Sequence, residues 1–137
     1  MFFYKKIKLP REIKLFVDSF TNSIKNKDLT SLKEHFSEKC KFHYDYTKFK
    51  QGVHEQSYEE TIEATQKQLN KLQKIENKVV AYTEKDKIYY VNLLCKDYLD
   101  AKVSEVSYME YEEELTIQKI DKMFRIINLS CIFKQLK

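Results

Sequence analysis

This sequence has very few of the residues that interrupt regular structure. Among its 137 residues, Gly52 is the one glycine, Pro10 is the one proline, and tryptophan is absent. Disordered linkers are rich in glycine and proline, and phosphate-binding loops need several glycines at fixed spacing. The composition therefore argues against kinases, NTPases and NAD(P) dehydrogenases. We expect no cofactor, and one domain with a single core over residues 1–137.

Arginine and long apolar runs are also scarce. Arg11 and Arg125 are the two arginines, and 25 basic residues are spread along the chain among 21 acidic ones, for a net charge of +4. Nucleic-acid-binding proteins gather basic residues on one face, so we expect no nucleic-acid partner. No run approaches the ~20 apolar residues of a membrane-spanning helix, so we expect no membrane partner. Residues 1–6 place apolar side chains before basic ones, which is a poor signal peptide.

The three cysteines are too few and too far apart for a disulfide framework. Cys40, Cys95 and Cys131 are odd in number, and two of them lie in apolar runs. This pattern is typical of buried free thiols in a reducing compartment and predicts a cytoplasmic protein. Cys40 and His43 with the distant His54 do not complete a four-ligand zinc set, so no metal site is expected.

The first half of the chain predicts three helices. The first runs from Pro10 to near Asn26, because its apolar residues recur at spacings of three and four. Asp28 is placed to cap a short second helix. Ser57 and Glu60 form a capping box for the third. The expected inward stripes are Ile13, Phe16, Val17, Phe20 and Ile24; Leu29, Leu32 and Phe36; and Tyr58, Ile62, Thr65, Leu69 and Leu72.

The rest of the chain predicts strands. Cys40, Phe42 and Tyr44 alternate with polar residues, as in a half-buried strand, and a loop follows over residues 46–56. Four long runs then cover residues 75–83, 88–98, 103–118 and 123–134, with short charged turns between them. The fold class is therefore α+β: three N-terminal helices packed on a strongly curved antiparallel sheet.

Alternation along these strands assigns the two faces of the sheet. The face expected against the helices carries Tyr89, Val91, Leu93, Cys95, Met109, Tyr111, Glu113, Leu115, Ile117, Ile127, Leu129, Cys131 and Phe133. The other face carries Tyr90, Asn92, Leu94, Tyr108, Ile126, Asn128, Ser130 and Ile132. This second face is too apolar for a fully wet surface, so we expect a homodimer formed through the outer face of the sheet.

The order of elements and three short motifs resemble the NTF2-like (SnoaL-like, cystatin-cone) superfamily. Residues 26–36 are similar to the family's GD-leucine second helix, with Lys27 where glycine is common. Gly52 stands before the third helix, as the family's loop glycine does. Residues 120–126 are similar to the DGKI motif at the start of the last strand, with Lys122 replacing glycine.

The resemblance implies a cone with a pocket at its open end. Members include ketosteroid isomerases, polyketide cyclases and dehydratases, and also non-catalytic transport and scaffold modules, so the fold does not choose the function. In the enzymes, acidic, His and Tyr side chains inside the cone perform acid–base chemistry. Two functions stay open here. One is binding of a small apolar or aromatic ligand with isomerase- or cyclase-type proton transfer; the other is a non-catalytic dimeric interaction module whose cone is filled.

Glu113 is the first candidate for a catalytic residue. It is in phase with inward-facing apolar residues, and a buried carboxyl titrates at a raised pH, as a general base requires. Two other interpretations remain. A β-bulge in residues 112–114 would turn the carboxyl outward, or Glu113 would pair with a lysine or with Arg125.

His43 and Asp45 are the second candidate pair, because an aspartate can orient a histidine as a base. Asp45 stands about where some family enzymes carry an acidic catalytic residue. However, Phe42 and Tyr44 have the phase of the core, which favours solvated positions for His43 and Asp45. The residues expected to line the pocket, unless they simply fill the core, are Phe16, Phe20, Tyr44, Tyr58, Tyr89, Tyr111 and Cys131.

Overall fold

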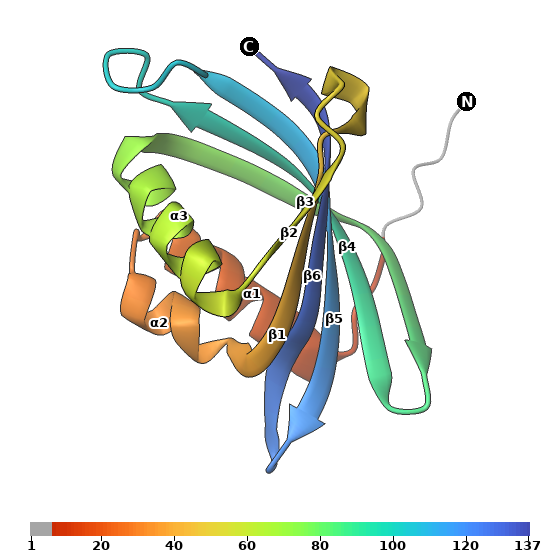
Figure 1. The fold of residues 1–137 in the computed structure, drawn as a ribbon. Coiled ribbons are helices and arrows are strands. Elements are labelled where there is room, and N and C mark those ends of the chain that lie inside the picture. The colour runs from red at the N-terminus through yellow and green to blue at the C-terminus, as the bar shows by residue number, and fades with distance from the viewer. Residues whose placement is uncertain (1–6) are drawn as a thin grey trace, which may run out of the picture.

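The structure, a computed structural model, describes residues 7–137, so the signal-peptide prediction for residues 1–6 lies outside it. Three helices and six strands follow one another, with the long strands sweeping around the helices (Figure 1). The elements are α1 (Arg11–Lys25), α2 (Leu29–Glu34), β1 (Phe36–Asp45), the 3-10 helix η1 (Thr47–Phe49), β2 (Val53–Gln56), α3 (Tyr58–Lys71), β3 (Leu72–Lys85), β4 (Ile88–Leu99), β5 (Tyr108–Ile120) and β6 (Met123–Leu136).

The six strands form one sheet in the order β2-β1-β6-β5-β4-β3. Four of the five strand pairs are antiparallel, as predicted, whereas β1 and β6 are parallel. The parallel pair joins the two halves of the chain: β1, the first strand, lies between β2 and β6, and β6 is the last strand of the meander β3 to β6. The predicted α+β class with three helices on a curved sheet is confirmed.

The predicted helix caps are confirmed. A carboxylate oxygen of Asp28 accepts a hydrogen bond from the backbone N–H of Ser31 at 3.0 Å. The hydroxyl oxygen of Ser57 accepts from the N–H of Glu60 at 3.2 Å, and the Glu60 carboxylate accepts from the N–H of Ser57 at 3.3 Å. These bonds satisfy backbone donors that the first helical turn leaves free, and they fix where α2 and α3 begin.

His35, just after α2, holds α2 against α1. Its ring nitrogens lie 2.9 Å from the Ser19 hydroxyl and 2.8 Å from the Ser31 carbonyl oxygen, and the residue is buried. The ring also packs against Phe16 and Phe20, with centroid distances of 5.3 and 5.9 Å. A polar side chain thus sits inside an aromatic cluster with both of its nitrogens paired.

Two segments differ from the predicted strands. Residues 103–107 are not part of β5, because Asp100 turns the chain: its side-chain oxygen accepts from the N–H of Lys102 at 2.9 Å and its carbonyl from Ser104 at 2.9 Å. Such local bonds compete with strand pairing. In the predicted loop over residues 46–56, β2 forms an additional strand that pairs with β1.

Two bulges of this sheet lie on β6 opposite β5, and further register shifts occur on β3 and on β1. The register passes from Thr116 facing Asn128 to Ile117 facing Ile126, which leaves Ile127 as an extra residue. The bulge reverses the predicted alternation, so Ile126 is buried instead of Ile127. A second bulge leaves Lys134 unpaired between the partners of Glu110 and Tyr111. Because β5 carries no extra residue here, its own alternation continues through the glutamates.

The two tight hairpin turns contain lysine where glycine is usual. Asp86 and Lys87 join β3 to β4 with φ of 52° and 63°, and Asp121 and Lys122 join β5 to β6 with φ of 49° and 69°. Two-residue turns with positive φ at both positions match the twist of the strands but favour Asn-Gly or Asp-Gly. The turns are therefore formed at a conformational cost.

Candidate functional site

A cavity of about 230 Å³ lies between the concave face of the sheet and the helices. Its wall is mostly apolar and aromatic and is built by all three helices and by all six strands. Phe20 of α1 and Phe42 of β1 are among the best buried side chains of the protein and form part of this wall. The helices and the sheet thus enclose an apolar space that their side chains do not fill.

Glu113 of β5 points into this cavity. The residue is 7% exposed and pairs with Leu93 on β4 and Cys131 on β6, so it lies on the concave face while Glu112 and Glu114 are on the other. Its one hydrogen-bond donor among residues 7–137 is the thiol of Cys131, 3.6 Å from a carboxylate oxygen. Burial, and then the negative charge of Asp97, raise the pKa of Glu113 from 4.5 to about 7.

Asp97 of β4 is a second buried carboxyl in the same cavity, and the sequence analysis did not select it. It is 5% exposed and accepts from the Tyr111 hydroxyl, which lies 3.1 Å from each carboxylate oxygen. Burial raises the pKa of Asp97 from 3.8 to about 6, although the Tyr111 hydrogen bond acts in the opposite direction. A sequence signal existed: Asp97 continues the inward alternation of Val91, Leu93 and Cys95 by one more step.

No cation balances these two acids within the cavity. Its lining residues, all from the described part of the chain, include neither lysine, arginine nor histidine. The negative charge of Asp97 therefore adds to burial in raising the pKa of Glu113, and no cation of the lining offsets it. Such a pair can hold a proton near neutral pH and release it when a ligand changes the local charge.

Of the seven residues expected to line the pocket, four do so and three lie elsewhere. Phe20, Tyr44, Tyr111 and Cys131 line the cavity. Burial raises the pKa of Tyr44. The other three pack within the apolar cluster: Phe16 and Tyr89 against Phe124, and Tyr58 against Phe42.

The structure does not bring His43 and Asp45 to the cavity. The alternation of β1 turns Phe42 and Tyr44 inward, so His43 and Asp45 point to the other face. A ring nitrogen of His43 lies 3.4 Å from the Glu55 carboxylate on β2. Asp45 accepts from the N–H of Thr47 at 2.8 Å, and hydrogen bonds from Thr47 lower the pKa of Asp45. His43 and Asp45 thus make contacts at the end of β1 and do not line the cavity that contains Glu113.

The described residues contain neither a cluster of metal ligands nor a membrane-spanning helix. Within residues 7–137, no three His, Cys, Asp or Glu side chains gather in a way that could hold a metal ion. Cys40 faces the core, where burial raises the pKa of its thiol to about 12, whereas His54 packs its ring on Tyr46 at 5.6 Å. None of the helices in the described range has the length and hydropathy needed to cross a membrane.

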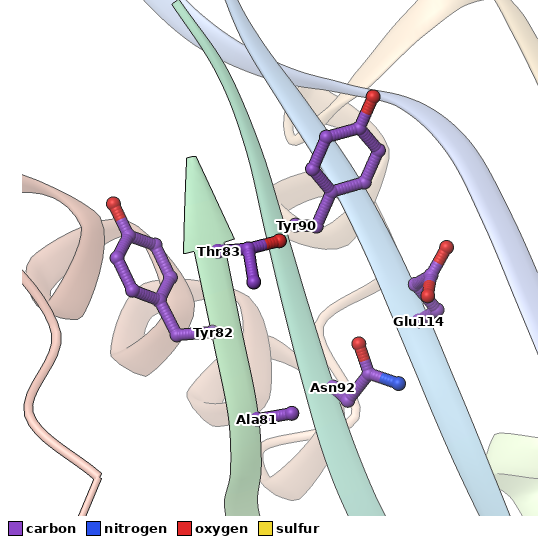
Figure 2. Close-up of a pocket in the computed structure, with 6 residues that line it drawn as sticks. All are labelled: Ala81, Tyr82, Thr83, Tyr90, Asn92 and Glu114. Atoms are coloured by element: carbon purple, nitrogen blue, oxygen red, sulfur yellow. The ribbon is translucent and has the colours of Figure 1, made fainter. Parts of the chain in front are cut away.

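A second hollow lies on the outer face of the sheet, over β3, β4 and β5 (Figure 2). It is open to solvent, measures about 410 Å³, and its lining residues are all exposed or half-buried. Figure 2 shows Tyr90, Asn92 and Glu114 rising from the outer face beside it. No buried ionisable group lines this hollow, so the inner cavity is the candidate site. The lining residues of the outer hollow are Ala81, Tyr82, Thr83, Tyr90, Asn92 and Glu114.

No protein-family model matches the sequence. No curated protein matches it either. Solved structures do match the fold. An NTF2-like protein of unknown function from Shewanella baltica has a TM-score of 0.71 at 7% identity, over 95% of this chain and 99% of its own.

Two further structures give similar values. A ketosteroid isomerase-like protein from Erwinia carotovora atroseptica has a TM-score of 0.69 at 7% identity, covering 90% of this chain and 94% of its own. A putative calcium/calmodulin-dependent protein kinase II association domain from Xanthomonas campestris has a TM-score of 0.68 at 16% identity, covering 98% of this chain and 97% of its own. At such identities the likeness shows the fold alone, and it confirms the resemblance found in the sequence: this chain has the NTF2-like, cystatin-cone fold.

Proposed function

We propose that this protein binds a small, mostly apolar ligand inside its cone, with the Glu113 carboxyl as the polar anchor. The observation that carries the proposal is the 230 Å³ cavity with a 7%-exposed carboxyl that receives one hydrogen bond, from a thiol. A buried polar group without a good partner is costly, and proteins retain such groups where they serve a ligand or a reaction. A cone filled by its own aromatic side chains fits this cavity less well.

The cavity volume limits the size of the ligand. Drug-sized ligands occupy pockets of roughly 300–1,000 Å³, and an apolar cavity of about 150 Å³ is enough to hold benzene. The 230 Å³ found here lies between these values. We therefore propose a ligand with one aromatic or aliphatic ring and a short polar group, which is smaller than a steroid.

Two methionines allow a direct test of binding. Met109 lines the cavity, whereas Met123 is 56% exposed at the β5–β6 turn. With ¹³C-methyl methionine, a library of one-ring compounds should shift the Met109 methyl resonance and leave Met123 unchanged. The variant Ala64→Phe, placed on the cavity wall, should abolish the shift, and Ala101→Phe in the exposed β4–β5 loop should preserve it. A library in which no compound shifts Met109 would contradict ligand binding.

Proton transfer to and from the ligand is a second candidate function, favoured by the pKa of Glu113 near 7. A general base works best when its pKa is close to the working pH. The neighbouring Tyr111 hydroxyl, which already donates to Asp97, would lie near a developing negative charge on the ligand. This arrangement suits abstraction of a proton next to a carbonyl, as in isomerase- or cyclase-type reactions.

Deuterium exchange tests this candidate without knowledge of the natural substrate. Acetophenone, a one-ring ketone, should exchange its methyl protons in D₂O faster with the protein than in buffer. In the variant Glu113→Gln this acceleration should be roughly a hundredfold smaller, which is the lower end of the rate enhancement that a positioned base contributes. Glu105→Gln, in the exposed β4–β5 loop, should behave as wild type. Equal exchange in wild type and Glu113→Gln would exclude Glu113 as the base.

We also propose that the protein forms a homodimer through the outer face of the sheet. Supporting this, β5 presents Glu112 and Glu114 on that face, β1 presents Lys41, His43 and Asp45, and β6 lies between them with Ile132 49% exposed. A two-fold axis along β6 would place Lys41 on β1 of one protomer over the acidic strand β5 of its partner. Sedimentation at micromolar concentration should give twice the 16.6 kDa mass of one chain, and Ile132→Lys should give monomer. A single 16.6 kDa species for wild type would overturn the dimer.

The three cysteines bear on the compartment. Cys40, Cys95 and Cys131 are all free and buried. Free thiols are kept reduced in the cytoplasm, which supports a cytoplasmic location as part of the proposal.

A further inference from the structure

We infer that the ligand of the cone is a small organic amine, bound as its ammonium cation at the carboxyl of Glu113, with Asp97 on the same cavity wall. This inference rests on the proposed ligand binding and adds the chemical class of the ligand. It follows from three features of the described residues: the unmatched acids, the absence of a basic group in the wall, and the aromatic rings that surround the space.

The first feature is the lack of good donors to Glu113. Among residues 7–137 the Cys131 thiol, at 3.6 Å, is the one hydrogen-bond donor to its carboxylate. A thiol is a weak donor, so the carboxyl can accept further hydrogen bonds from the cavity side. Asp97 accepts from one hydroxyl, that of Tyr111, and also retains free lone pairs. An ammonium group carries several N–H donors and would give Glu113 charge-assisted bonds, while its positive charge also attracts Asp97 on the same wall.

The second feature is the sign of the charges around Glu113. The ionisable groups that face it are Asp97 and Cys95 from β4, Tyr111 from β5, Cys131 from β6 and Tyr44 from β1. Every one of these is neutral or negative, and the helices add no charged residue to the cavity wall. An anionic ligand would be repelled, whereas a cation would supply the missing counter-charge.

The third feature favours an organic cation over a metal ion. Calcium takes six to eight oxygen ligands, and within the described range no three acidic, His or Cys residues gather around one point. The cavity is instead walled by rings, including Tyr46 stacked on Phe133 with centroids 4.3 Å apart and Tyr111 5.4 Å from Phe133. Aromatic faces attract ammonium groups and also pack against an apolar ring of the ligand.

The geometry also predicts how binding responds to pH. In the free protein burial keeps both carboxyls partly protonated near neutral pH, since the pKa of Glu113 is about 7 and that of Asp97 about 6. A bound cation stabilises the ionised carboxylates and lowers both pKa values. Amine binding should therefore release protons at pH 6 to 7, and affinity for the amine should rise from pH 5 to pH 8.

Three one-ring probes of nearly equal size separate the alternatives: benzylamine, benzyl alcohol and benzoate. Binding to the full chain is measured by calorimetry and by the Met109 methyl resonance, at pH 5 and pH 8. We expect benzylamine to bind about tenfold more tightly than benzyl alcohol at pH 8, a difference of about 1.4 kcal/mol, and benzoate not to bind. Calorimetry in two buffers of different ionisation enthalpy should show proton release for benzylamine at pH 6.5.

Variants test whether the acids cause the preference. Glu113→Gln should bring benzylamine to the level of benzyl alcohol, Asp97→Asn should reduce the preference, and Glu105→Gln in the exposed β4–β5 loop should retain it. The pH series on wild type supports or opposes the inference even if a cavity variant fails to fold. If benzyl alcohol binds as well as benzylamine at pH 8, the amine inference is wrong and the proposed ligand binding stands. If none of the probes shifts Met109, both are overturned.

Discussion

The Tyr111 hydroxyl lies 3.1 Å from both carboxylate oxygens of Asp97, deep in the core and between neighbouring strands of one sheet. This bond links two polar groups that would each be costly to bury alone. It also positions Asp97 on the same cavity wall as Glu113, two residues beyond Tyr111 on β5. The positions of both carboxyls on the cavity wall, Asp97 on β4 and Glu113 on β5, thus follow from the alternation of side chains along these strands.

Tyr111→Phe should destabilise the protein more at high pH than at low pH. The change removes the donor to Asp97, which raises the pKa of Asp97 further above its present value of about 6. We expect a loss of roughly 1–3 kcal/mol in the free energy of unfolding at pH 8, where the carboxylate is ionised, and a smaller loss at pH 5. Urea unfolding measures both. The control is Tyr108→Phe, which removes a half-buried hydroxyl beside Glu110; equal losses at both pH values for Tyr111→Phe would contradict the role of the bond.

Glu113→Gln should stabilise the ligand-free protein at pH 8. The carboxyl titrates near 4.5 in the unfolded chain and near 7 in the folded protein, so the folded state binds the proton more tightly. The contribution of Glu113 to the free energy of unfolding is therefore most favourable below about pH 4.5 and is lost as the pH rises through about 7. The difference between the two pKa values of Glu113 corresponds to roughly 3 kcal/mol of unfolding free energy.

Thermal or urea unfolding between pH 4 and pH 8 measures this effect. Wild type should lose stability across the range, whereas Glu113→Gln should show a flatter profile. Glu105→Gln, in the exposed β4–β5 loop, is the control and should follow wild type. A variant Glu113→Gln that is less stable than wild type at pH 8 would show that Glu113 has a stabilising partner in the folded protein.

The sequence predicted the cone and offered one of its two acids, Glu113, as a candidate, because both depend on regular alternation; an outward position of Glu113 at a bulge or a pairing with a basic residue stayed open. Glu113 could be assigned a face because β5 has no extra residue near it, whereas Ile126 and Ile127 were interchanged by a bulge on β6. Nothing in a single sequence marks where a bulge occurs, since its cause is the twist and the pairing of neighbouring strands. Asp97 was missed although its phase was right, because its hydrogen bond with Tyr111 exists only after β4 and β5 pair.

His35→Leu should cost roughly 1–3 kcal/mol of unfolding free energy at pH 7.5, because the Ser19 hydroxyl and the Ser31 carbonyl lose a partner inside the protein. Leucine has a similar size, so the loss reports the hydrogen bonds more than a cavity. His54→Leu, at an exposed position on β2, should change stability little and serves as the control. Equal effects of the two substitutions would mean that His35 does not hold α1 and α2 together.

Lys122→Gly should stabilise the β5–β6 hairpin. Lys122 has φ of 69°, a region that glycine enters without steric cost. After allowing for the greater flexibility of glycine in the unfolded chain, we expect a gain of about 0.5–1 kcal/mol in urea unfolding. Lys78→Gly, within β3 at extended backbone, should instead lower stability. A loss for Lys122→Gly as large as that for Lys78→Gly would contradict the strained turn.

The account as a whole depends on two acids buried in a cavity without a cation. The most direct test is a ¹³C NMR titration of the side-chain carboxyl of Glu113 in the ligand-free protein. The account predicts a midpoint near pH 7, raised by burial and by Asp97. A midpoint near the ordinary value of 4.5 would mean that Glu113 is solvated or paired, and the proposed site would then lose its polar anchor.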